Sequence, residues 1–211
     1  MHRLGRLLVV AAHFDDEVLG AGGLLGSAPG STVLVLCDPY TKGRKDLERQ
    51  ALSLEAADMV ARTFGIKYEP AGLEDEQLRL ADAVDAIEQA IARNNANVIV
   101  SHWSGDMNQD HRVTADAATI AARLSRTQVR ALFAMEIPSS SDVGDPPPPS
   151  GAAYQEISWA AKSAMLEWYR HELYADRSPE VVRALATTRG AQVGVEYAEM
   201  FPVRRLAFRA E

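Results

Sequence analysis

Two short clusters of histidine and acidic residues follow apolar runs of the chain. The first cluster is His13-Phe14-Asp15-Asp16-Glu17, directly after the apolar residues 7–12. Carboxylates this close repel one another and raise one another's pKa values unless a cation lies among them. A divalent metal ion bound here would remove that conflict. The alternative is an acidic helix start, in which the same carboxylates face the positive N-terminal end of a helix.

The second cluster lies between Ser101 and Arg112, again directly after an apolar run. It contains His102, Asp106, Asn108, Asp110 and His111. A catalytic zinc ion usually takes three protein ligands from histidines and carboxylates and leaves its fourth position to water. The sequence has neither an HExxH nor a CxxC motif, so those common zinc sites are excluded. One His and one Asp of the first cluster and one His of the second would complete such a set; polar residues that cap a helix are the alternative for either cluster alone.

Apolar runs and helical periodicity predict the elements that must position both clusters. Buried strands are predicted at residues 7–12, 32–37 and 98–100, and further strands at residues 129–137 and 203–208. Helices are predicted at residues 16–26, 46–65, 80–94, 113–125, 160–174 and 179–188. The alternation of strand and helix predicts a three-layer, Rossmann-like α/β fold with a mostly parallel sheet. Because ligands bind at the carboxyl ends of such strands, both clusters are expected at one crevice.

Composition limits the class of protein. The chain has 211 residues, 47% of them hydrophobic, and a net charge of −7 with scattered basic residues. We therefore expect a single domain over residues 1–211 that inserts in no membrane and binds no nucleic acid. Cys37 is the only cysteine, which excludes an intramolecular disulfide and favours a reducing, cytoplasmic setting. The apolar residues 7–12 are interpreted as a strand and not as a leader, since charged residues interrupt the run at once.

Residues 138–151 form a low-complexity stretch that is rich in serine and proline, with four consecutive prolines at residues 146–149. Consecutive prolines favour an extended segment without ladder hydrogen bonds. A surface loop is the simpler interpretation. The alternative is a lid that covers a substrate, because long loops within compact domains are often functional.

The motifs together resemble the LmbE/PIG-L family of zinc-dependent N-acetylglucosaminyl deacetylases. The pattern AHxDDE follows the first strand, Gly20-Ala21-Gly22-Gly23 lies in the next helix, and Asp110-His111-Arg112 follows a middle strand. Further similar segments are Glu48-Arg49 and the stretch from Gly194 to Phe201. The resemblance covers nearly the whole chain, and its two-loop motif pair is specific.

This resemblance implies a role for each matching residue. His13, Asp16 and His111 would bind one Zn²⁺, although such a site also accepts Fe²⁺ or Co²⁺. Asp15 would be the general base that takes a proton from the zinc-bound water, whose pKa the metal lowers towards about 7. Arg49 would contact the substrate, with a solvated helix arginine as the alternative.

The second cluster departs from the family pattern. Asn108 stands where many members have a histidine; its amide can donate a hydrogen bond to an oxyanion but cannot shuttle a proton near neutral pH. Asp110 is expected to orient His111 or another catalytic group. Asp106 replaces a tyrosine of some members, and we expect Asp106 and His102 to contact substrate. Phe14, in place of the usual proline, removes no ligand.

The resemblance implies a hydrolase that removes the acetyl group from an N-acetylated amino sugar of the N-acetylglucosamine type, or from a sugar conjugate. One alternative is an amidase that cleaves a larger N-acyl group from a sugar conjugate or an antibiotic-like metabolite. A second is a nucleotide-binding module that uses the glycine-rich turn at residues 20–23. A third is a sugar-binding protein stabilised by metal but without activity. The expected partner is a small molecule, and homo-oligomerisation is left open.

Overall fold

A seven-stranded sheet forms the centre of the molecule in the computed structural model, which describes residues 5–41, 44–123, 126–141 and 152–208. Its strand order is β5-β2-β1-β6-β7-β9-β8. The strands are β1 (Leu7–Ala11), β2 (Thr32–Asp38), β5 (Lys67–Glu74), β6 (Val98–Ser101), β7 (Ala131–Ala134), β8 (Ala152–Glu156) and β9 (Ala198–Leu206). The first five in this order pair in parallel, whereas β9 runs antiparallel to both β7 and β8. A separate two-stranded hairpin consists of β3 (Tyr40–Thr41) and β4 (Arg44–Lys45).

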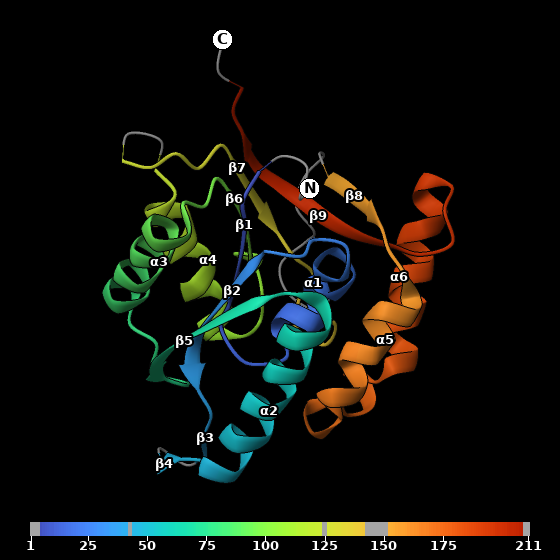
Figure 1. Ribbon diagram of the computed structural model, residues 1–211, viewed down its shortest axis with the longest axis horizontal. Helices are drawn as coiled ribbons and strands as arrows, with labels where there is room; N and C mark the ends of the chain where they lie inside the picture. The colour runs from blue at the N-terminus through green and yellow to red at the C-terminus, as the bar shows by residue number, and fades with distance from the viewer. Residues whose placement is uncertain (1–4, 42–43, 124–125, 142–151, 209–211) are drawn as a thin grey trace.

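Helices cover both faces of the sheet (Figure 1). They are α1 (Asp16–Gly26), α2 (Leu47–Phe64), α3 (Leu80–Asn94), α4 (Gln109–Ala121), α5 (Trp159–Trp168) and α6 (Pro179–Val193). Short 3₁₀ turns at Arg170–Glu172 and Ala175–Arg177 connect α5 to α6. Helices α3 and α4 lie on one face, and α1, α2, α5 and α6 lie on the other. The predicted three-layer α/β architecture with a mostly parallel sheet is confirmed.

The central strand β1 shows why this sequence forms a sheet covered on both faces. Leu7, Val9 and Ala11 belong to the core on the α1 side, while Leu8 and Val10 belong to the core on the α3 and α4 side. All five side chains are buried. Such a continuous apolar run is typical of a parallel strand with helices on both faces. The run ends where the first polar cluster begins, at the carboxyl edge of the sheet.

Two glycines of helix α1 lie very close to isoleucine side chains of the segments that follow β7 and β8. A Cβ atom at Gly23 would lie 2.4 Å from Ile157 Cγ2, and one at Gly20 would lie 2.8 Å from Ile137 Cδ1. These glycines therefore exclude larger residues by steric contact. The glycine-rich stretch, which the sequence left open to a nucleotide-binding interpretation, serves here for close packing of helix on sheet.

A buried ion pair, Lys162–Glu199, anchors the middle of α1. The Lys162 Nζ atom donates to the carbonyl oxygen of Leu19 and to Glu199 Oε1, both at 2.7 Å. Glu199 in turn accepts hydrogen bonds from the backbone N–H groups of Gly23 and Leu24, each at 2.8 Å. Residues of α5 and β9, far along the chain, thus hold the helix that begins at the first polar cluster.

Some predicted boundaries were wrong, and two strands of the main sheet were missed. The helix predicted from residue 113 begins at Gln109, and the strand predicted from residue 203 begins at Ala198. Strand β5 was missed because it is an edge strand with half-exposed residues, a proline and a glycine, and so has no apolar run. Strand β8, also at an edge, was missed for a similar reason. Most of the loop at 138–151 lies outside the described residues, so its role as a lid stays a prediction.

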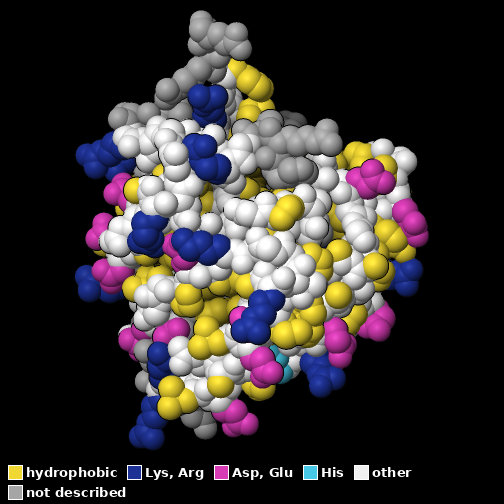
Figure 2. Space-filling model, viewed as in Figure 1, with side chains coloured by type: hydrophobic (Ala, Val, Ile, Leu, Met, Phe, Trp, Pro, Cys, Tyr) yellow, Lys and Arg dark blue, Asp and Glu magenta, His cyan; other side chains and the backbone are white. Residues whose placement is uncertain are grey.

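The surface carries charges of both signs. Figure 2 shows basic and acidic side chains interspersed on the displayed face, with apolar side chains between them. Among the described residues, no helix combines the length and apolar composition that crossing a bilayer requires. The predicted absence of a nucleic-acid partner stays a prediction.

Candidate active site

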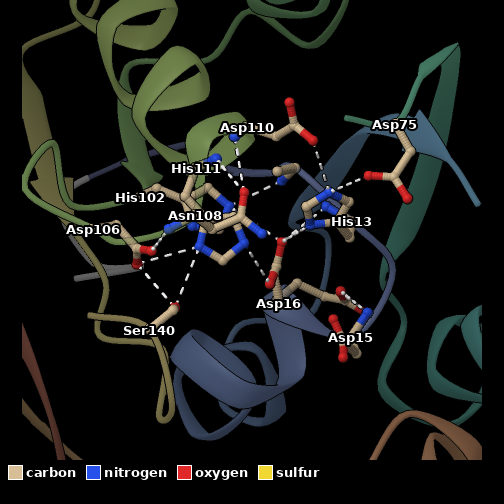
Figure 3. Close-up of polar contacts among 12 residues, drawn as sticks. His13, Asp15, Asp16, Asp75, His102, Asp106, Asn108, Asp110, His111 and Ser140 are labelled. Atoms are coloured by element: carbon tan, nitrogen blue, oxygen red, sulfur yellow. Dashed lines mark hydrogen bonds and ion pairs between the residues drawn. The ribbon is translucent and has the colours of Figure 1, made fainter. Parts of the chain in front are cut away.

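The two polar clusters meet at the carboxyl edge of the sheet, as predicted (Figure 3). His13, Asp15 and Asp16 follow β1, whereas His111 lies in the first turn of α4, after β6. A third segment, which the sequence analysis did not include, brings Asp75 from the end of β5 to the same place. The segments after strands β5, β1 and β6 therefore place residues from distant parts of the chain around one centre.

His13, Asp16 and His111 are arranged as a metal-binding group. One ligand atom from each residue lies within 4.8 Å of the others. Asp16 Oδ1 is 3.3 Å from His111 Nε2, and Asp16 Oδ2 is 3.4 Å from His13 Nδ1. Although burial disfavours the charged form of Asp16, His111 and His102 hold the pKa of that carboxyl well below its usual range. Asp16 is therefore ionised, as a metal ligand must be.

Two other groups meet the same distance criterion among the described residues, but their atoms fit a metal less well. One contains Cys37, and burial raises the pKa of that thiol to about 12, which disfavours the thiolate a metal needs. The other contains His102 and Asp106. This group is buried throughout, and His102 and Asp106 do not line the cavity through which a substrate would reach a metal ion. Of the three groups, His13, Asp16 and His111 therefore best match the donor set of a catalytic zinc site, because they offer two histidines and one aspartate beside a cavity.

Each of the two histidines has a carboxylate beside its second ring nitrogen. Asp106 Oδ2 is 3.2 Å from His111 Nδ1, which leaves Nε2 facing Asp16. Asp75 Oδ1 is 3.0 Å and Asp110 Oδ2 3.4 Å from His13 Nε2, which leaves Nδ1 facing Asp16. Such carboxylates fix the tautomer and the orientation of a ligating imidazole.

The carboxylate beside His111 is that of Asp106 and not that of Asp110. We expected Asp110 to orient His111 or another catalytic group; in the structure it contacts His13, the second of these alternatives, while Asp106 contacts His111. Asp110 and His111 are consecutive on a helix, so their side chains diverge, whereas Asp106 lies in the preceding loop and faces the ring. Ser140 and Ser141 donate to Asp106 Oδ2 at 3.0 and 2.6 Å and hold its carboxylate in place.

Asp15 lies at the start of α1 with an unusual backbone. Its φ angle is +105°, a region that L-residues rarely adopt, and it is buried. Burial and the neighbouring Asp16 raise the pKa of the Asp15 carboxyl well above its usual range, and Arg177 opposes them. Arg177 Nη1 donates to Asp15 Oδ2 at 3.0 Å. A carboxylate with a raised pKa, held at a cavity wall, is suited to accept a proton.

Asn108 caps α4 and lines the same cavity. Its Oδ1 atom accepts the backbone N–H groups of Asp110 and His111, at 2.8 and 3.3 Å. Because the oxygen is held by the helix end, the NH₂ group of the amide is left to donate elsewhere. This orientation is compatible with the predicted hydrogen bond to an oxyanion.

A cavity of about 590 Å³ opens over these residues. Its lining includes the predicted residues His13, Asp15, Asp16, Arg49, Asn108, Asp110 and His111. It also includes Asp75, Glu76, Gln109, Tyr174 and Arg177, which sequence reasoning missed. The acidic run at residues 74–76 was the only available signal for two of these, and it follows a strand that was not recognised. Arg177 and Tyr174 belong to no recognisable motif. Their position at the cavity depends on how the chain folds after α5, which the local sequence does not indicate.

Three residues predicted to contact substrate take different positions. Arg49 lines the cavity, with Nε and Nη2 donating to the two carboxylate oxygens of Glu172 at 2.6 and 2.8 Å. His102 and Asp106 have fully buried side chains and do not line the cavity. His102 stacks on His111 with ring centroids 4.0 Å apart. The geometry of His102 and Asp106 favours support of the metal-binding group over contact with a substrate.

Comparison with known families gives one match. Residues 8–122, more than half of the chain, match the PIG-L family, described as GlcNAc-PI de-N-acetylase. This segment contains both polar clusters and Asp75. A search of curated proteins found no match.

Solved structures share the fold along nearly the whole chain. A conserved protein from Thermus thermophilus is 24% identical, with a TM-score of 0.76 and coverage of 97% of this chain and 96% of that one. GalB, a 4-carboxy-2-hydroxymuconate hydratase from Pseudomonas putida, is 19% identical, with a TM-score of 0.75 and coverage of 98% and 99%. A deacetylase of teicoplanin biosynthesis, solved with teicoplanin, is 18% identical, with a TM-score of 0.72 and coverage of 97% and 100%. Because a hydratase and a deacetylase share this fold, the reaction must be argued from the site.

Proposed function

The chain belongs to the PIG-L family, and from this premise we propose that it is a metal-dependent deacetylase that hydrolyses the N-acetyl group of an amino sugar or sugar conjugate. The observation that carries the proposal is the convergence of His13, Asp16 and His111 beside Asp15 at one cavity. His₂Asp with an adjoining space for water is the ligand arrangement of catalytic zinc sites. We propose one Zn²⁺ per chain, with Fe²⁺ or Co²⁺ as chemically acceptable substitutes.

The metal, when bound, would polarise the amide carbonyl and lower the pKa of the attacking water. Asp15 takes the proton from that water and returns it to the nitrogen of the leaving amine, so one carboxyl group acts first as base and then as acid. Arg177, 3.0 Å from Asp15, holds the carboxylate in position and limits the rise of its pKa. The Asn108 amide donates to the oxyanion that forms as the carbonyl carbon becomes tetrahedral. The products are acetate and a free amine.

The cavity lining favours a short acyl group. The described residues that line the cavity are all charged or polar, with Tyr174 as the only aromatic one besides the histidines. A long acyl chain would find little apolar surface there, whereas acetyl needs almost none. The alternative of an amidase for larger acyl groups shares every proposed catalytic residue and is less well supported by this lining.

A nucleotide-binding function has less support still. The glycines at residues 20–23 are used in packing α1 against neighbouring side chains. The acidic residues Asp15 and Asp16 stand at the start of α1, where a dinucleotide site needs room for a pyrophosphate. The hydrolase also fits the expected cytoplasmic, small-molecule setting of the chain.

The proposal is tested with the whole protein and a panel of N-acetylated sugars and conjugates. Protein stripped with a chelator and protein reconstituted with Zn²⁺ are each assayed for released acetate and for new primary amine. We expect both products in equal amounts, loss of turnover on chelation and recovery with Zn²⁺. Turnover that survives complete metal removal would overturn the metal dependence of the proposed reaction. Release of a larger acid in place of acetate would overturn the proposed acetyl specificity.

A further inference from the structure

The wall of the cavity carries more negative than positive charge. Five carboxylates line it, those of Asp15, Asp16, Asp75, Glu76 and Asp110. Two arginines, Arg49 and Arg177, oppose them, and no lysine is among the described lining residues. If all five carboxylates are ionised, the two arginines and a bound divalent ion supply four positive charges, and the formal charge of the lining is −1.

Both arginines are already engaged by carboxylates of the protein. Arg49 binds both oxygens of Glu172, whose side chain is only 5% exposed, and this planar two-bond pair is among the strongest that an arginine forms. Glu172 adds a further negative charge directly behind the wall. Arg177 donates to Asp15. A phosphate or carboxylate of a substrate would therefore compete with these carboxylates for the arginines and would meet the remaining acids unpaired.

Glu76 is the acid of the wall that is best placed to act on a substrate without acting on the metal. Its backbone N–H donates to Asp110 Oδ2 at 2.8 Å, and its carbonyl oxygen accepts from Gln109 Nε2 at 2.5 Å. The residue has a φ angle of +63°, is exposed and lines the cavity. Its backbone is thus held in place by α4, and the residue lines the cavity.

We propose that this site selects N-acylated amines without negative charge, and that Glu76 is a specificity-determining residue that disfavours phosphorylated and carboxylated substrates. The inference rests on the proposed function and narrows its substrate class to neutral, polyhydroxylated N-acyl amines. The same negative charge favours binding of the amine product, because the released amine is protonated near neutral pH and its positive charge is attracted by the acidic wall.

The test compares matched substrates with the zinc-loaded protein. A neutral pair, N-acetylglucosamine and its β(1,4)-linked diacetylated disaccharide, is compared with N-acetylglucosamine 6-phosphate and 1-phosphate. We expect kcat/KM for the better neutral sugar to exceed that for either phosphate at least about tenfold near 20 mM salt. The ratio should shrink near about 0.5 M salt, because exposed charges are then screened.

Variants of Glu76 test whether this residue causes the preference for neutral substrates. Glu76→Gln should reduce the neutral-to-phosphate ratio about threefold, and Glu76→Lys should reduce it further. The matched control is Glu196→Gln, a change of an exposed glutamate outside the cavity lining, which should leave the ratio unchanged. An equal shift in the control would show that net charge alone, and not the wall, sets the preference.

The outcomes separate this inference from the proposed function. Hydrolysis of the phosphates at equal or higher kcat/KM overturns the charge selection and leaves the deacetylase intact. If no sugar is hydrolysed, the proposed function fails, and direct binding of glucosamine and glucosamine 6-phosphate to the zinc-loaded protein decides the charge selection. Tighter binding of glucosamine then supports it, and tighter or equal binding of the phosphate overturns it.

Discussion

Two buried groups of charged residues border the same helix, α1, and they differ in how completely the protein neutralises them. At the middle of the helix, Lys162 and Glu199 form an ion pair of one positive and one negative charge. Backbone groups of Leu19, Gly23 and Leu24 complete the hydrogen bonds of this pair. The space that borders this pair measures about 10 Å³. At the start of the helix, Asp15 and Asp16 lie among further acids beside a cavity of about 590 Å³.

The difference separates a structural charge cluster from a functional one. Buried charges are tolerated when a partner and hydrogen bonds compensate them. The Lys162–Glu199 pair meets that condition from within the chain. The cluster at the start of α1 has an excess of carboxylates and an open side, so Arg177 and the two histidines compensate it only in part, and the proposed metal ion would supply the missing positive charge. The following predictions test this contrast, from the largest expected effect to the smallest.

Asp15→Asn should separate catalysis from metal binding. The amide keeps the shape of the side chain but cannot accept the proton, so kcat should fall about 10²- to 10⁴-fold. The Zn²⁺ content, measured by elemental analysis of the purified variant, should stay at the wild-type value. An undiminished kcat would remove Asp15 from its assigned role, and loss of zinc would show that it acts as a ligand.

Lys162→Met should mainly affect stability. It leaves Glu199 buried without its cation, which should lower the free energy of unfolding by about 3–5 kcal/mol. The double variant Lys162→Met/Glu199→Leu should recover part of this loss, because an apolar pair leaves no uncompensated charge. Urea unfolding followed by circular dichroism measures both.

The matched control for that pair is Lys67→Met, which removes an exposed lysine from its ion pair with Glu69 at the surface. Exposed pairs contribute at most about 1 kcal/mol, so this variant should unfold almost as the wild type does. If Lys162→Met is no more destabilised than Lys67→Met, the buried pair does not hold α1.

Asp106→Asn should weaken the metal site without unfolding the protein. Asp106 fixes the ring of His111 through Nδ1, and loss of such a partner typically costs about 10- to 100-fold in metal affinity. Competition with a chromogenic chelator measures the Kd for Zn²⁺. The control is Asp116→Asn, a change at an exposed position of α4, the helix that carries His111; it should leave that Kd unchanged.

Zinc affinity should increase with pH. Burial alone would lower the pKa of His111, but Asp16 and Asp106 outweigh it and raise the pKa to about 9. In the metal-free protein His111 is therefore protonated near neutral pH and must release a proton to bind the metal. Burial would also lower the pKa of His13, but Asp110, Asp16 and Asp75 outweigh it and raise that pKa well above its usual range. Each histidine that must release a proton contributes about a tenfold fall in Kd per pH unit, so the Kd should fall between about tenfold and a hundredfold per unit between about pH 6 and 8. A Kd that does not change over this range would contradict the tautomer and ligand assignment.

Much of the fold and part of the site follow from local sequence patterns. The run from Leu7 to Ala11 is apolar throughout, as a strand covered on both faces must be, and the polar residues directly after it must lie at the sheet edge. The same reasoning placed His111 near His13, because β1 and β6 are neighbours in the sheet. Spacing and residue type thus predicted which loops meet.

The remaining parts depend on contacts that no local pattern records. Asp75 follows an edge strand whose residues are half exposed, so neither the strand nor its last loop was recognised. Arg177 reaches Asp15 across 162 positions of sequence. The exchange of partners between Asp106 and Asp110 depends on the direction of two side chains at a helix start, which residue spacing alone does not determine.

The ion pair that anchors α1 also sets an order of events for a chain made from its N-terminus. The proposed base and metal ligands all lie between residues 13 and 111, yet Glu199 belongs to a strand near the other end of the chain. While the ribosome is still adding the intervening residues, α1 lacks the carboxylate that binds its backbone and the arginine that holds Asp15. Domains form as units once their parts are available, so the proposed site gains its full set of contacts only after residue 199 has been added, and a shorter nascent chain carries the proposed ligands without the contacts that hold them.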